Sequence, residues 1–112
     1  IADAKKLVLR LLEDDYTPPV SRPVPAPGKN ELALLKLGVK SAVLAGMATE
    51  YDFFIACKIA DVLAGGDVVR GSLITEQYYL DLEREAFLSL CGEPKTQERI
   101  KALLTTGKPL RN

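Results

Sequence analysis

A run of prolines near the amino terminus is the feature that most restricts how this chain can fold. The segment YTPPVSRPVPAPGKN, residues 16–30, holds five prolines between Pro18 and Pro27. Proline has no amide hydrogen to donate, and it disfavours helix in the residue before it. The stretch 15–29 is therefore expected to be extended or polyproline-like, and to divide the chain into a short first part and a longer second part.

Two interpretations of this proline-rich stretch are open. It could be a ligand for a domain of the SH3 type, or it could be a semi-rigid connector. The string PVPAPG has little beyond its prolines to recommend it as a ligand. The connector is the favoured interpretation.

Helical periodicity is present on both sides of the connector. Residues 2–14 are expected to form a first helix with Asp3 as its N-cap, and its apolar positions are Leu7, Val8, Leu11 and Leu12. A second helix is expected from an Asn30 cap to about Met47. Small residues at four-residue steps in the second helix would let another helix approach closely, namely Gly38, Ala42 and Gly46.

A third helix is expected from a Thr49 cap to about Ala64, where two consecutive glycines end it. It is apolar on nearly every side, a pattern typical of a central helix. Lys58 lies within the wide apolar face. It could bind an anionic substrate, but a lysine that reaches solvent or an ion pair is the favoured interpretation.

A fourth helix is expected from a Thr75 cap to about Cys91, and it places Glu83 near the middle of its apolar face. Burial of an unpaired carboxylate costs several kcal/mol, so Glu83 needs a partner or a proton. It could be a general acid or base with a raised pKa. No second carboxylate follows at helical spacing on that face, so a structural ion pair is favoured, with three candidate partners: Lys58, Arg84 and Arg99.

The carboxyl-terminal residues carry several stop and start signals. Gly92 and Pro94 are expected to end the fourth helix, and Thr96 to cap a fifth that extends to about Thr106. A helix this short is not stable alone, so it must dock on another part of the protein. No strand alternation or long repeat is present. The prediction is an all-α fold, a small bundle of four to five helices forming a single domain over 1–112, with its helical core in 30–112.

Composition excludes several classes of function. Fifteen basic residues balance fifteen acidic ones without a cationic cluster, which argues against a nucleic-acid surface or a polybasic membrane anchor. The longest apolar region, 31–48, contains two lysines and is a poor membrane span. The loop GGDVVRGSL lacks the lysine of a phosphate-binding loop and follows a helix rather than a strand.

The sequence contains no histidine, and its two cysteines, Cys57 and Cys91, are far apart. These facts exclude Ser–His and Cys–His nucleophiles and leave too few ligands for a structural zinc ion. The thiols are expected to be buried and reduced, as in a cytoplasmic protein. The chain begins at Ile1 without a signal-peptide pattern, so it is expected to be a fragment or a processed chain.

The strings EYDFFIACKIADVLAGGD and EQYYLDLEREAFLSLCGEPKTQERI, followed by GKPLRN, carry a resemblance over about 47–112. They resemble the end of multifunctional fatty-acid β-oxidation proteins, in which a 3-hydroxyacyl-CoA dehydrogenase precedes a crotonase-like enoyl-CoA hydratase/isomerase domain. Members of that family have a glutamate four residues before a phenylalanine, here Glu83 and Phe87, then a capped helix and a basic residue near the end, here Lys108.

The resemblance implies that these helices are the carboxyl-terminal portion of a larger enzyme. Its oxyanion hole, acidic catalytic side chains and NAD-binding loop would lie upstream, so no catalytic residue and no cofactor are expected in this chain itself. Acyl-CoA would be the substrate and NAD the cofactor of the parent enzyme. Lys108 is the one expected ligand, for the CoA phosphates, and its alternative is a solvated tail lysine.

Three functions remain open at this point. The first is a packing and oligomerisation piece of the β-oxidation enzyme, which also covers the acyl-CoA pocket and partners upstream domains of the same chain. The second is an independent helical interaction module that uses the small-residue strip. The third is a small acid–base enzyme built on Glu83. A homodimer is expected, because an apolar surface without its core would be covered by a second copy.

Overall fold

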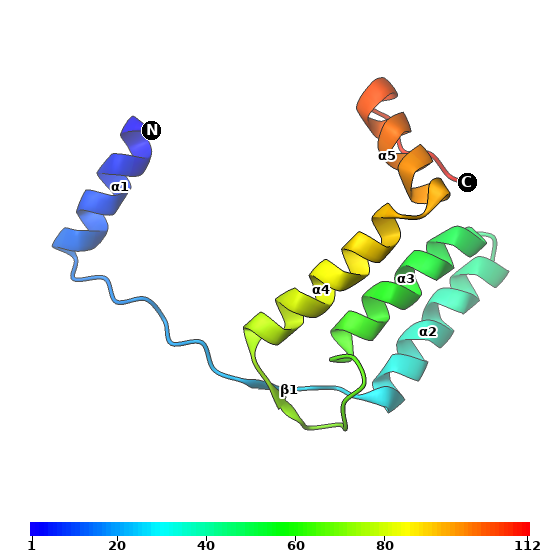
Figure 1. Cartoon of the computed structure of the whole chain (residues 1–112), viewed down its shortest axis with the longest axis horizontal. Helices are drawn as coiled ribbons and strands as arrows, with labels where there is room; N and C mark the ends of the chain where they lie inside the picture. The colour runs from blue at the N-terminus through cyan, green and yellow to red at the C-terminus, as the bar shows by residue number, and fades with distance from the viewer.

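The computed structural model describes all residues, 1–112, and consists of five helices with one small antiparallel sheet (Figure 1). The helices are α1 (Ala2–Glu13), α2 (Lys29–Leu44), α3 (Glu50–Leu63), α4 (Glu76–Cys91) and α5 (Pro94–Thr106). The strands are β1 (Val24–Pro25) and β2 (Leu73–Ile74). The predicted helical class and helix number are confirmed, whereas the two short strands were not predicted.

The central helices form one row in which α3 packs between α2 and α4 (Figure 1). Two ion pairs join α2 to α3: Lys36 Nζ lies 3.0 Å from Asp61 Oδ1, and Lys40 Nζ lies 2.9 Å from Glu50 Oε1. The central place predicted for the third helix is confirmed. α5 follows α4 after a sharp bend, and α1 lies apart from the row at the end of an extended segment (Figure 1).

The two strands anchor the last residues of the proline-rich connector. Val24 pairs with Ile74 and Pro25 with Leu73. The Ala26 amide donates to the Ser72 carbonyl at 2.8 Å, and the Gly71 amide donates back to the Ala26 carbonyl at 2.8 Å. The connector is extended, as predicted, but its end is fixed against the helical row rather than free. Four apolar residues are buried around this point, namely Ala26, Ala60, Ala64 and Ile74.

Two predicted helix starts are confirmed. The Thr49 hydroxyl accepts from the Asp52 amide at 3.0 Å, and the Asp52 carboxylate accepts from the Thr49 amide at 2.8 Å, so both halves of a capping box are present. The Thr75 hydroxyl accepts from the Tyr78 amide at 3.2 Å. The glycine predicted to follow the last helix, Gly107, has the left-handed φ of 67°.

Three predicted N-caps are wrong: Asp3, Asn30 and Thr96. α1 begins directly after Ile1, α2 after Gly28, and α5 after Glu93 with Pro94 in its first turn. Proline needs no amide partner in the first turn of a helix, which explains the earlier start of α5. Each predicted cap therefore lies inside its helix.

The structure is open for its size. A compact protein of 12.2 kDa exposes about 6,100 Å² and has a radius of gyration of about 13 Å. This chain exposes 8655 Å² and has a radius of gyration of 19.1 Å. Many large apolar side chains consequently face solvent. No helix combines the length and the apolar character needed to cross a membrane.

Candidate functional site

The most prominent concave surface is an apolar groove of about 820 Å³ between α3 and α4. Both helices contribute apolar side chains to it, and the end of the connector closes one side near the start of α4. Phe87, which is 61% exposed, lies along this groove rather than in a core. The lining residues used below are Ser21, Arg22, Val24, Lys58, Leu80 and Glu83. Such a lining suits packing or an apolar ligand.

Lys58 and Glu83 both lie in this groove, but the predicted ion pair of Glu83 is wrong. Glu83 is exposed and has neither an ion pair nor a side-chain hydrogen bond. Arg84 pairs with Asp81 instead, and Arg99 pairs with Asp52. The periodicity placed Glu83 on the apolar face correctly. The groove is open to water, however, so the carboxylate needs no partner there.

Lys58 likewise makes no ion pair, and its Nζ lies 6.0 Å from the centre of the Phe54 ring. The side chain follows apolar surface and ends near solvent, which agrees with the favoured interpretation of a lysine that reaches water. Its charge is also near an aromatic face, where a cation is weakly stabilised.

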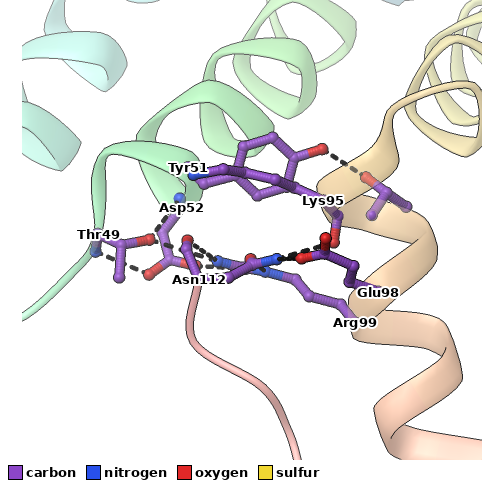
Figure 2. A network of polar contacts seen from close by, with 8 residues as sticks. Thr49, Tyr51, Asp52, Lys95, Glu98, Arg99 and Asn112 are labelled. Carbon is purple, nitrogen blue, oxygen red and sulfur yellow. Dashed lines mark hydrogen bonds and ion pairs between the residues drawn. The ribbon is translucent and has the colours of Figure 1, made fainter.

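A polar network around Arg99 joins three separate parts of the chain (Figure 2). Arg99 Nη1 donates to Asp52 Oδ1 at 2.6 Å, and Arg99 Nη2 lies 3.3 Å from the Thr49 hydroxyl. The guanidinium also lies 5.0 Å from the centre of the Tyr51 ring. The side chain of Arg99 is 19% exposed. α5 is thus attached to the amino-terminal end of α3 by a planar cation that fits both a carboxylate and an aromatic face.

The last residue of the chain, Asn112, completes this network (Figure 2). Its side-chain oxygen accepts from Arg99 Nε at 2.7 Å, and its amide nitrogen donates to Glu98 Oε2 at 2.8 Å and to the Lys95 carbonyl at 3.2 Å. The tail after Gly107 therefore turns back onto the first half of α5. α5 is thus attached to α3 by polar contacts, whereas its apolar side chains Ile100, Leu103 and Leu104 stay exposed, so the expected docking of its apolar side is not present within this chain.

Thr96 contacts α3 rather than capping α5 as predicted. Its hydroxyl lies 2.7 Å from the Tyr51 hydroxyl, in a second contact between α5 and α3. Nothing in the local sequence separates this use of threonine from a cap, because both place a hydroxyl near a helix start. The pairing of Arg99 with Asp52, 47 residues apart, was also not predicted. The capping box could have been found from Thr49 and Asp52.

The network lowers the pKa of Asp52 to about 2 from an ordinary value of 3.8, chiefly through the hydrogen bond from the Thr49 amide and then through the one from Arg99. A carboxylate with a lowered folded-state pKa stabilises the fold above its unfolded pKa, and this contribution is lost as pH falls toward 2. We expect a loss of about 1 kcal/mol, since Asp52 is partly exposed.

Urea unfolding between about pH 6 and pH 2 would measure this loss against an Asp52→Asn variant. The stability advantage of the native chain over the variant should shrink as Asp52 takes up its proton. An advantage that stayed constant down to pH 2 would contradict the assignment.

Lys108 lies in the exposed tail, outside the groove. Its backbone amide donates to the Thr106 hydroxyl at 3.2 Å, and its ammonium makes no ion pair. The two cysteines are both free, but the prediction that they are buried is wrong, because both are half-buried. No group of three or more acidic, cysteine or histidine side chains is placed to hold a metal ion. Around the small-residue strip, nothing lies within 4 Å of an added Cβ at Gly38 or Gly46, so no helix packs there.

Comparison with known proteins gives one informative match. A protein of Bacillus subtilis (strain 168) with the name "Probable 3-hydroxyacyl-CoA dehydrogenase" is 48% identical over 110 residues. The match covers 98% of this chain but only 14% of the length of that relative. No family model matches the chain, and no solved structure does.

Proposed function

We propose that this chain is the helical carboxyl-terminal portion of a 3-hydroxyacyl-CoA dehydrogenase of fatty-acid β-oxidation, and that it serves as a packing and oligomerisation element. The observation that carries the proposal is the 48% identity over nearly the whole chain to a protein named for that activity. The match spans only 14% of the relative, which supports a role as one part of a larger enzyme.

The open apolar surfaces support a packing role. The groove between α3 and α4 has an apolar lining, and the chain exposes about 2,600 Å² more than a compact protein of its mass. Surfaces of this kind mark contacts with other protein. Lys58 and Glu83 are charged groups of the groove, and neither is held by a polar partner as a catalytic group would be.

In the proposed parent enzyme, a 3-hydroxyacyl-CoA gives a hydride to NAD and a proton to a base, which leaves the 3-ketoacyl-CoA. We place the residues for this step, and those of a crotonase-like hydratase domain, upstream of this chain. The sequence resemblance to the β-oxidation family is the basis for the hydratase assignment. The free cysteines agree with a cytoplasmic location.

The test of the proposal is deletion of the matched 110 residues from the Bacillus subtilis relative, with NAD reduction by a 3-hydroxyacyl-CoA as the readout. Loss of activity, through either a misassembled or an insoluble enzyme, is the expected result. A soluble shortened enzyme with unchanged activity and unchanged oligomeric state would overturn the packing role.

For Lys108 we propose a contact with the phosphates of CoA, which rests on the family resemblance and on its free ammonium in an exposed tail. We predict that Lys108→Ala in the full-length parent enzyme weakens acyl-CoA binding roughly tenfold, because one charge-assisted contact is lost. Lys101→Ala, which removes an exposed lysine of α5 close to the tail, is the matched control. Equal binding by both variants would reject the contact.

A further inference from the structure

α1 is an amphipathic helix whose apolar side has no partner. Leu7, Val8, Leu11 and Leu12 form a stripe along one side, while charged residues occupy the other. A helix of 12 residues is marginal in water, because its hydrogen bonds barely offset the entropy of ordering it. α1 therefore needs a surface to dock on, and in a single copy it lies apart from the helical row (Figure 1).

The groove between α3 and α4 matches α1 in length and character. At 1.5 Å per residue, α1 is about 18 Å long, α3 about 21 Å and α4 about 24 Å. Because α1 is shorter than both helices that form the groove, it can lie along the groove without extending past either end. The lining is mostly apolar and includes Leu80 and Phe87 of α4.

The groove and α1 each carry charges of both signs, so opposite charges can meet across the contact. Lys5 and Arg10 lie on either side of the apolar stripe of α1, and Glu76 and Glu83 of α4 line the groove. Glu83 has no cationic partner within one copy. Lys5 of an α1 helix laid in the groove would supply one.

The connector determines which copy supplies the helix. Its residues Ser21, Arg22 and Val24 lie at the groove, and the Ser21 hydroxyl donates to Glu76 Oε2 at 3.3 Å. To return to its own groove, α1 would have to reverse direction within residues 14–20. Prolines 18 and 19 fix the backbone there and keep the residue before them extended. Asp14 and Asp15 form a turn at the end of α1, and residues 16–20 extend away from the helical row (Figure 1). At about 3.1 Å per residue, these five residues span about 16 Å.

We propose that two copies of this chain exchange their first helices, so that α1 of each copy lies in the α3/α4 groove of the other. The exchange needs no reversal of the connector, and it makes both contacts identical, as a two-fold dimer requires. Each copy exposes about 2,600 Å² more surface than a compact protein of its mass, which is enough to form such a dimer, since a standard interface takes about 800 Å² from each partner. The inference concerns surfaces within these 112 residues and does not rest on the dehydrogenase assignment.

Light scattering across a concentration series is the first test, with matched leucine substitutions on each surface. The native chain should have twice the 12.2 kDa mass of one copy. Leu11→Glu on the apolar stripe and Leu80→Glu in the groove should each raise the dimer dissociation constant by at least ~tenfold. Leu9→Glu, on the opposite side of α1, and Leu88→Glu, on α4 outside the groove, should leave it within about twofold.

A cross-linking experiment tests whether the helix is exchanged. Both native cysteines are first replaced with alanine, after which one tagged copy carries Leu11→Cys and a second, differently tagged copy carries Leu80→Cys. A disulfide that joins the two tags is the expected product. A monomer at every concentration, a dimer indifferent to Leu11→Glu, or a disulfide closed only within a copy that carries both cysteines would each overturn the exchange.

Discussion

Replacement of Gly28 with alanine is expected to destabilise the helical row by about 3 kcal/mol. Gly28 has φ of 84° and ψ of −171°, a conformation that is essentially limited to glycine. A Cβ there would lie 2.7 Å from the Arg70 amide nitrogen and 2.8 Å from the Arg70 Cα. Backbone atoms cannot rotate away as a side chain can, so either the loop or the connector must shift.

The shift would also disturb the hydrogen bond from the Gly28 amide to the Ala64 carbonyl, 3.0 Å long, which fixes the start of α2 against the end of α3. Urea unfolding followed by circular dichroism measures the loss. Gly38→Ala is the matched control, because it lies within α2 with nothing within 4 Å of its Cβ, and it should stabilise the chain by about 1 kcal/mol. If both substitutions changed the free energy of unfolding by the same small amount, the close approach of Gly28 to the Arg70 backbone would be contradicted.

Arg99→Ala is expected to release α5 and the tail, with a loss of about 2 to 3 kcal/mol in the local stability of that region. The substitution removes the ion pair with Asp52 and both hydrogen bonds to Asn112, and it leaves the Asp52 carboxylate without its cation. Hydrogen exchange of the α5 amides reports this local opening directly, because α5 can unfold without the rest of the row.

Two further arginine substitutions sharpen this test. Arg99→Lys keeps the charge but cannot reach both Asp52 and Asn112 with a planar fork, so its effect should be intermediate. Arg84→Ala removes an exposed pair with Asp81 one turn away, and it should change stability by less than about 0.5 kcal/mol. Exchange in α5 that is equally fast in the Arg99→Ala and Arg84→Ala variants would contradict the role of Arg99.

The helices could be predicted from the sequence because their information is local. Apolar spacing and the threonines at 49 and 75 set the limits of α3 and α4 within a residue or two. The anchored end of the connector could not be predicted in this way. It depends on hydrogen bonds between Ala26 and residues 71–72, whose partners are about 45 positions away and leave no periodic signal.

The two charged residues singled out in the sequence show the same limit. Glu83 lies on the apolar face, as its position in the helix requires, but whether that face is covered depends on the neighbouring elements. The sequence suggests Arg99 only as a partner for Glu83, whereas the sharp bend between α4 and α5 directs it to Asp52. Side-chain partners across a helix junction follow from the geometry of the junction, which composition and spacing do not encode.

The measurement that most directly tests the assignment to a 3-hydroxyacyl-CoA dehydrogenase is replacement of the matched 110 residues of the Bacillus subtilis relative with this chain. NAD reduction by a 3-hydroxyacyl-CoA is followed for the native and the chimeric enzymes at equal concentrations of folded protein. We predict that the chimera keeps its activity within about tenfold, because equivalent packing surfaces meet the same upstream domains. A chimera that folds and assembles like the native enzyme but no longer reduces NAD would contradict the assignment.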